Sequence, residues 1–450
     1  MLKRTLTIWD AVALTIGSVL GSGLLLLPGL TYHDVGSGGA LLAWLFMGMM
    51  AIPFILIFSN LTQRHPDASG IAGYIAQAFG SRWSKGATYV LAGTFPVGIP
   101  ALSLIGANYV AYALGLNSWQ TMAVGYGVVL LAVGTNWMGV KAGTRLQNIT
   151  VALLSALLTV TVFLVLPHSR LTRISWHLAW HPLWQAMALV FWAYLGWENM
   201  SFTAEEFRNP RRDFRFSLFI GFAVILLLYL GITFSVVTIL PQTAAVTTEA
   251  PIAGMLHQML GGVGGDLVAL LAFLITVINA NAWVWGGSRL YYSGGRDRAL
   301  PPFLGRIDDA SGAPRYAVAT LWVLYTLNYV GMALWHYSIT TLILIFSQNF
   351  LVLYLLSIFA YFKLNRSWRS RLLAVITLIV TGIFMAVFTW ILPSARGENK
   401  KIIFLGLIAK EMVPCLAKSS LMNTPMPTPL VVGAGPVIRA LCEEIGFVEA

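Results

Sequence analysis

The sequence predicts an all-α integral membrane protein of about eleven transmembrane spans. Of its 450 residues, 58% are hydrophobic and 10% are charged, whereas about a quarter of the residues in a soluble domain are charged. A membrane span needs roughly 20 apolar residues, and runs of that kind recur along the chain. They occupy residues 8–30, 38–61, 86–114, 119–138, 146–167, 184–204, 216–240, 264–287, 316–335, 338–362 and 372–392.

The distribution of basic residues predicts the orientation of these spans. With a cytoplasmic N-terminus, 20 of the 28 Lys and Arg residues fall in cytoplasmic loops, 2 fall in outer loops, and 6 follow residue 392. The positive-inside rule therefore favours a cytoplasmic N-terminus. The net charge of +11 reflects this asymmetry and does not indicate a nucleic-acid partner. The first apolar run is too long for the core of a cleaved signal peptide.

Neither cysteine nor histidine indicates thiol chemistry or a metal site within the predicted spans. Cys415 and Cys442 are the only cysteines, and both lie in the last 36 residues. The seven histidines lie in or near the predicted loops, without the spacing of metal ligands. We therefore expect no catalytic residue, no metal and no cofactor.

The segment 393–450 differs from the rest of the chain. Its apolar run of eight, residues 402–409, is too short to span a membrane. The stretch "MNTPMPTPLVVGAGPVIRALCEEIGFVEA" that ends it resembles the start of an insertion-element transposase. We expect a transmembrane domain over 1–392 and a poorly ordered, foreign tail that has replaced a twelfth helix. A natural soluble tail is the alternative.

The first apolar run contains the stretch "IGSVLGSGLLLLPG", which is poorly suited to a continuous helix. Gly17, Gly21 and Gly23 allow the backbone to unwind, and they allow a ligand to touch it. A break inside a membrane frees backbone groups that lipid cannot satisfy, whereas a polar ligand can. A helix-packing face at Gly17-x-x-x-Gly21 is the alternative.

The sixth run, within "MALVFWAYLGWENMSFTAEEFRNPRRDF", supports a second break. Gly196 lies in mid-span among aromatic residues, and Glu198 is the only one of the seventeen acidic residues that falls well inside a predicted span. An intramembrane carboxylate indicates a functional site by default, although a protonated Glu that only joins helices is the alternative. Glu205 and Glu206 follow in a stretch that we expect to be a solvated inner loop, where pairs with arginine contribute little.

The two breaks lie five spans apart, which is typical of an inverted repeat of five helices plus five. We expect the first repeat over about 8–168, the second over about 184–362, and an extra helix at 372–392. The binding site would lie where the breaks meet. Half-helix N-termini there suit a carboxylate, and freed carbonyl groups suit an ammonium group, so the site fits a zwitterion.

Four ordered motifs resemble those of the amino acid–polyamine–organocation (APC) transporters, whose fold is the LeuT-type inverted repeat. The resemblance covers about residues 9–392. It rests on "GSVLGSGLLLLPG", "HPDASGIAGYIAQAFG", "FWAYLGWEN" with "EEFRNPRRDF", and "GGSRLYYSGGRDRALPPFLGRI". Within the family, "TFPVGIPA" and "RHPDASGIAGYIAQAFGSR" are most similar to bacterial exporters of methionine and branched-chain amino acids.

This resemblance implies that the substrate carboxylate meets the backbone of the first break and the amine meets carbonyls near the second. It implies that Trp192 packs on the substrate side chain. Several relatives carry a lysine in the fifth span where this chain has an apolar residue near Leu154, so Glu198 is the candidate for proton coupling. The substrate-binding candidates are Ile16, Gly17, Ser18, Gly21, Ser22, Gly23, Phe191, Trp192, Tyr194 and Gly196.

We therefore expect an exporter of neutral aliphatic amino acids (methionine, leucine, isoleucine or valine) in the bacterial inner membrane, working by alternating access. An uptake permease driven by protons and an inactive remnant of a disrupted gene are the alternatives. The preferred amino acid and the choice between monomer and homodimer stay open. Asn279, Asn281, Ser288, Gln348 and Asn349 are polar residues in spans, for which we favour a structural role.

Overall fold

The computed structural model describes residues 4–21, 23–64, 66–177, 179–244, 247, 251–335 and 339–391. Over these residues it is helical, and its only β element is an isolated bridge between Leu6 and Phe207. Seven of its helices are long and apolar enough to cross a membrane. The predicted all-α membrane fold is therefore confirmed.

Most of the helices follow the predicted apolar runs, but those at 71–79 and 251–260 lie outside every predicted run. The helices are α1 (Ile8–Val19), α2 (Gly23–Arg64), α3 (Ile71–Phe79), α4 (Ser81–Leu114), α5 (Ser118–Met138), α6 (Val140–Val165), α7 (Trp180–Ala193), α8 (Pro210–Ile239), α10 (Pro251–Leu260), α11 (Gly262–Arg296), α12 (Arg315–Trp335), α13 (Ile339–Leu364) and α14 (Trp368–Ile391), with short 3-10 helices η1 (Leu166–His168), η2 (Leu171–Arg173), η3 (Asn199–Glu206) and η4 (Pro302–Gly305).

The first apolar run is interrupted, as the sequence predicts. A capping box between Thr7 and Asp10 starts α1, which satisfies backbone N–H groups that have no partner within the helix. The helix ends at Val19, and α2 begins four residues later at Gly23. The chain then turns within α2 at Gly36, whose φ of 74° favours glycine. The two predicted runs 8–30 and 38–61 are thus joined by a kink and not by a loop.

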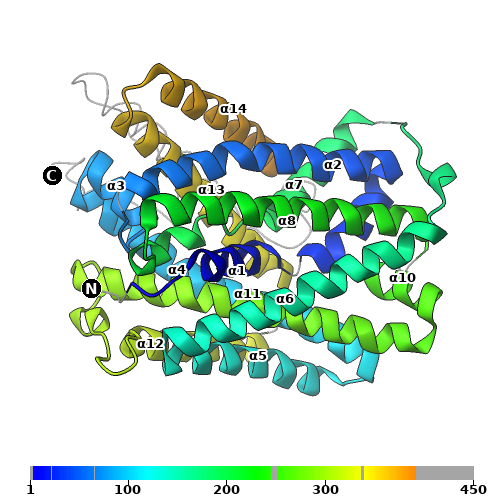
Figure 1. Ribbon diagram of the computed structural model, residues 1–450, viewed down its shortest axis with the longest axis horizontal. Coiled ribbons are helices and arrows are strands. Elements are labelled where there is room, and N and C mark those ends of the chain that lie inside the picture. Colours follow the sequence, from blue (N-terminus) through cyan, green and yellow to red (C-terminus); the bar gives the residue numbers. More distant parts are fainter. Residues whose placement is uncertain are drawn as a thin grey trace.

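The sixth run is interrupted too. Helix α7 ends at Ala193, a non-helical stretch follows, and η3 begins at Asn199. Most helices run roughly along the long axis of the molecule, with α1 in its interior beside α8, α6 and α11 (Figure 1). This packing brings the two breaks together at mid-length. The two-repeat relation and the domain limits stay predictions, and the segment 393–450 lies outside the described residues.

Candidate functional site

A cavity lies where the two helix breaks meet. Both breaks contribute to its wall, and α4, α11 and α13 close it from the other sides. Its lining is mostly apolar or aromatic, and its polar side chains are those of Ser18, Asn279 and Trp283. The residues around it are Ser18, Val19, Gly21, Gly23, Gly98, Ala101, Leu102, Trp192, Ala193, Leu195, Asn279, Trp283 and Phe346.

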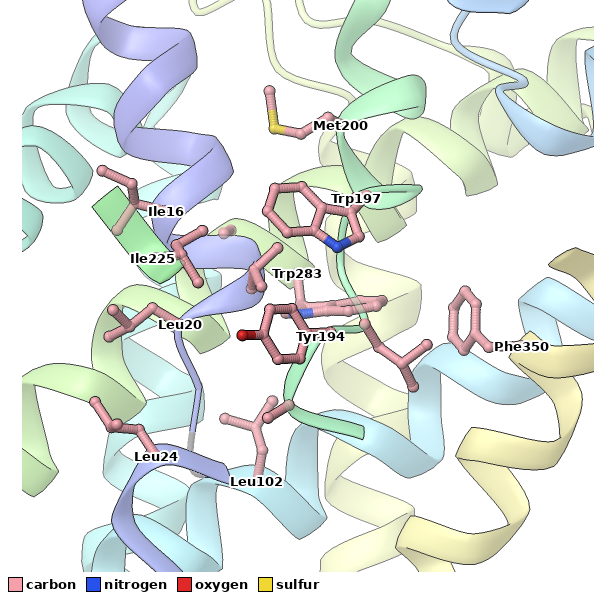
Figure 2. Packing of buried hydrophobic residues seen from close by; sticks show 14 of the residues in the cluster. Ile16, Leu20, Leu24, Leu102, Tyr194, Trp197, Met200, Ile225, Trp283 and Phe350 are labelled. Carbon is pink, nitrogen blue, oxygen red and sulfur yellow. The ribbon is translucent and has the colours of Figure 1, made fainter. Parts of the chain in front are cut away.

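Side chains from α11 satisfy the carbonyl groups at the end of α1. The amide of Asn279 donates to the carbonyl oxygens of Gly17 at 2.7 Å and Ser18 at 3.0 Å. The indole N–H of Trp283 donates to the same Ser18 oxygen at 2.9 Å. Trp283 also contacts Phe350, with ring centroids 5.5 Å apart (Figure 2). Protein groups thus replace the intrahelical hydrogen bonds that the break removes, as a break inside a membrane requires.

Tyr229 of α8 touches the last turn of both half-helices. Its hydroxyl oxygen lies 2.9 Å from the carbonyl oxygen of Val19 in α1 and 2.9 Å from that of Ala193 in α7. A phenol has one proton, so it donates to one of these carbonyls at a time. The ring is held edge-on by Trp44 and Tyr194, at centroid distances of 4.9 Å and 5.2 Å. Tyr229 therefore ties the two breaks together.

Gly196 allows the second break to approach the first. Its φ of 127° lies in the region that favours glycine. A Cβ atom there would lie 2.5 Å from the carbonyl oxygen of Ser18. Its N–H donates to the carboxylate of Glu198 at 2.9 Å. Both the backbone conformation and the close approach therefore exclude a larger residue at this position.

Glu198 is fully buried beside the second break. One carboxylate oxygen accepts hydrogen bonds from the N–H of Gly196 and the hydroxyl of Tyr354. The other oxygen, Oε1, has no hydrogen-bond partner among the described residues, and none of the ion pairs recorded there involves Glu198. A buried carboxylate without a cation costs much free energy when it is ionised. This geometry suits a group that takes up and releases a proton.

The three aromatic candidates of the sixth run are placed differently. Trp192 lines the cavity and packs over Gly23 at the start of α2. Phe191 packs instead against Phe54 and Tyr354, each with ring centroids 6.4 Å apart. The hydroxyl of Tyr194 donates to the carbonyl oxygen of Trp44 at 3.1 Å. Trp192 is thus the one of these three aromatic residues that lines the cavity.

The predicted binding residues divide into two groups around this cavity. Ser18, Gly21, Gly23 and Trp192 line it. The others lie behind the wall. Gly17, for instance, packs so tightly that an added Cβ atom would lie 1.7 Å from the amide nitrogen of Gln147. Substrate contacts stay a prediction for all of them. Those behind the wall are Ile16, Gly17, Phe191, Tyr194 and Gly196, and Ser22 lies outside the described residues.

Sequence reasoning missed most of the far wall. Asn279 has the structural role that we favoured, because its amide donates to a backbone carbonyl. It also lines the cavity. Trp283 lies four residues later on the same helix face, a spacing that could have linked the pair. The motif "TFPVGIPA" supplies Gly98 and Ala101, yet it served only as a sign of resemblance. Leu102, Leu195 and Phe346 carried no signal that separates them from other apolar residues.

The expectation of a solvated inner loop was wrong for Glu206. Its side chain is fully buried and pairs with Arg289 of α11, which is 2% exposed, through contacts of 2.5 Å and 3.1 Å. The indole N–H of Trp285 adds a third bond at 3.0 Å. The N-terminal segment is attached beside this pair, because the N–H of Leu6 donates to the backbone carbonyl of Glu206 at 2.9 Å. Tertiary packing, which the local charge pattern does not reveal, buries the pair.

A second ionic cluster lies nearer the surface. Arg296 at the end of α11 contacts Glu205 at 2.6 Å and Asp67 at 2.8 Å. Partial burial alone would raise the pKa of Asp67, but hydrogen bonds from Ser69 and the positive charge of Arg296 outweigh it and lower that pKa below its ordinary value. The cluster therefore joins the loop before α3 to η3 and α11. Among the described residues, no group of His, Cys, Asp and Glu could hold a metal ion.

Comparison with known proteins agrees with this architecture. Residues 6–409 match the family described as Amino acid permease. An "Uncharacterized amino acid permease YecA" of Bacillus subtilis is 26% identical, over 81% of this chain and 86% of its own length. The "L-methionine/branched-chain amino acid exporter YjeH" of Escherichia coli is also 26% identical, over 86% and 93%. The crystal structure of MhsT in complex with L-phenylalanine shares the fold, with a TM-score of 0.64, 12% identity, and coverage of 86% of this chain and 99% of that one.

Proposed function

The chain belongs to the amino acid permease family, and we propose that it exports neutral aliphatic amino acids across the bacterial inner membrane by secondary active transport. The cavity between the two helix breaks is the observation that carries this proposal. It offers one substrate both the start of α2 and the carbonyl oxygen of Ala193 at the end of α7, which is free whenever Tyr229 donates to Val19 instead. Alternating access would expose this cavity to each side of the membrane in turn.

The substrate carboxylate binds at the start of α2. The helix begins at Gly23, which lines the cavity together with Gly21. The first N–H groups of a helix have no intrahelical partner, and the positive end of the helix dipole attracts an anion. The amine binds at the second break, where Ala193 and Leu195 line the cavity and a backbone carbonyl can accept from it.

An aliphatic side chain fits the rest of the cavity. Leu102, Trp192 and Phe346 supply apolar surface there, and no carboxylate or basic side chain is among the residues that line it. Burial of apolar surface would therefore favour methionine, leucine, isoleucine or valine over a charged amino acid. The name of the exporter from Escherichia coli supports this substrate class and the outward direction. The phenylalanine held by MhsT supports an amino acid substrate.

Glu198 couples transport to protons. It lies on the second break, close to the amine site, and its free oxygen Oε1 gives it a place for a proton. Uptake of a proton there removes a buried charge, so the protonation state would change the energy of the break. The excess of Lys and Arg in alternate loops supports a cytoplasmic N-terminus.

Efflux from loaded cells tests the proposal. Cells lacking their own exporters would be loaded with dipeptides that contain methionine or leucine, and release of the free amino acid would be followed. We expect faster efflux with the intact chain and with a chain cut after Leu392. Glu198→Gln keeps the size of the side chain and should lose the response to an imposed proton gradient, while Glu205→Gln should keep it. If no variant moves amino acid although all reach the membrane, the export proposal fails and a disrupted remnant becomes the interpretation.

Uptake is the second candidate function, because the relative from Bacillus subtilis is named a permease. The same cavity serves either direction, since alternating access is reversible. Vesicles with an outside-acid proton gradient separate the two candidates. Accumulation of external leucine under that gradient would favour a proton symporter over the exporter.

A further inference from the structure

A basic pocket lies at one end of the helical bundle, away from the cavity between the breaks. Four arginines line it: Arg4, Arg64, Arg208 and Arg212. Gln63, Pro66, Asn209 and Pro210 complete its wall, so the lining contains no acidic residue. We propose that this pocket binds a phosphate-bearing anion, such as the headgroup of an anionic phospholipid.

Three segments that are distant in sequence build the pocket. Arg64 is the last residue of α2, and Arg208 precedes the first turn of α8. Arg4 comes from the N-terminal segment, which is tied to the same region because the N–H of Arg208 donates to the carbonyl oxygen of Leu6 at 3.2 Å. The tertiary structure therefore gathers like charges that repel one another. Such an arrangement is stabilised when an anion lies between them.

Most of these arginines have no acidic partner among the described residues. Arg212 pairs with Asp213 at 3.0 Å, and its side chain is 68% exposed. None of the ion pairs recorded among the described residues involves Arg4, Arg64 or Arg208. The carboxylate of Asp67, which follows Pro66 in the chain, already forms an ion pair with Arg296. Within the described part of the chain, three guanidinium groups are thus without a carboxylate partner, and guanidinium matches the geometry of phosphate oxygens.

The start of α8 adds to the positive electrostatic potential of the pocket. Asn209 and Pro210 line the pocket, and Pro210 is the first residue of the helix. The side chain of Asn209 makes no capping hydrogen bond. The positive end of the helix dipole therefore points toward the pocket, as at other anion sites. This contribution reinforces the arginines, which carry the argument.

The position favours a lipid headgroup as the source of the phosphate. Helices α2 and α8 pack against each other, and both are apolar enough to cross a membrane. The pocket lies at the ends of these two helices, which is where phosphate groups of a bilayer lie. Basic pockets between helix ends are known to take up anionic headgroups. A free inorganic phosphate has the same chemistry, so the experiment must separate the two.

Lipid binding to the purified full-length chain tests the proposal. Native mass spectrometry in mild detergent would compare phosphatidylglycerol with phosphatidylcholine. We expect a preference for phosphatidylglycerol, and Arg64→Gln/Arg208→Gln should weaken it about 30-fold. Each of the two arginines contributes about equally to the free energy of binding an anionic lipid, so removing both multiplies their effects on affinity. The matched control is Arg366→Gln/Arg369→Gln, which removes two exposed arginines outside this pocket and should keep the preference.

Inorganic phosphate is the second arm. If it raises the melting temperature of the unsubstituted chain, and Arg64→Gln/Arg208→Gln removes the effect, free phosphate is a ligand of the pocket. If it has no effect while phosphatidylglycerol still binds through these arginines, the ligand is the lipid headgroup. Equal binding of both lipids, with no phosphate effect, would overturn the proposal. So would a preference for phosphatidylglycerol that both double variants retain.

Discussion

The indole N–H of Trp283 donates a hydrogen bond of 2.9 Å to the carbonyl oxygen of Ser18, 265 residues earlier in the chain. This bond connects α11 to the last turn of α1, where the helix has stopped supplying its own donors. Ser18 and Trp283 both line the cavity between the breaks. The relationship therefore links the stability of the break with the shape of the proposed binding site.

Replacing Trp283 with phenylalanine should weaken substrate binding while it leaves the chain folded. A smaller aromatic ring remains, but the Ser18 carbonyl loses one of its two side-chain donors. Loss of one such bond costs about 1 kcal/mol, which corresponds to about a fivefold higher KM for transport. Transport kinetics in proteoliposomes would measure it. Trp119→Phe, at an exposed tryptophan of α5, is the control and should leave KM unchanged; an equal KM for Trp283→Phe would contradict the prediction.

Replacing Gly196 with alanine should destabilise the protein. The positive φ and the 2.5 Å approach to the Ser18 oxygen together should cost about 3 kcal/mol or more. Thermal unfolding of the detergent-purified chain would show a lower melting temperature. Gly127→Ala is the matched control, since that glycine lies in α5 with no atom within 4 Å of the added Cβ. It should be neutral or stabilising by about 0.5 kcal/mol.

Breaking the pair between Glu206 and Arg289 should destabilise the protein strongly. Arg289→Met leaves a buried carboxylate without its cation, which costs about 3–5 kcal/mol. Glu206→Leu/Arg289→Met removes both charges and should recover much of that loss. Asp34→Asn, in the exposed pair with His33, should cost less than about 1 kcal/mol. Chemical unfolding compares the three, and a single variant as stable as the double variant would count against the buried pair.

The acid stability of the protein should depend on Asp67. Its pKa is lowered from an ordinary value of 3.8, so the folded state favours the ionised carboxylate. The contribution is fully present above pH 3.8 and is lost as the pH falls through the lowered pKa. Melting temperatures at decreasing pH should therefore fall more steeply for the unsubstituted chain than for Asp67→Asn. Asp34→Asn, away from Arg296, should keep the steep decrease; identical curves for all three would refute the role of Asp67.

Much of the fold could be predicted from the sequence because membrane burial leaves a local signal. Runs of apolar residues predicted where most of the helices lie. Lipid cannot satisfy free backbone groups, so a helix break inside the membrane needs residues that allow it, and these are visible in the sequence. The glycines of residues 17–23 and Gly196 gave that signal, and both breaks occur there. Ser18, Gly21, Gly23 and Trp192 of the cavity wall followed from it.

Only the tertiary structure decided which side chains complete the site and where charge is buried. Trp283 and Phe346 are unremarkable apolar residues in sequence, and they face the cavity because their helices pack beside the breaks. Glu206 resembled a solvated charge until α11 placed Arg289 against it. Arg64 and Arg208 share a pocket only in the folded chain. The composition of a segment determines whether it prefers lipid or water, so it can be read from the sequence. Contacts between distant segments depend on how the helices pack, so they cannot.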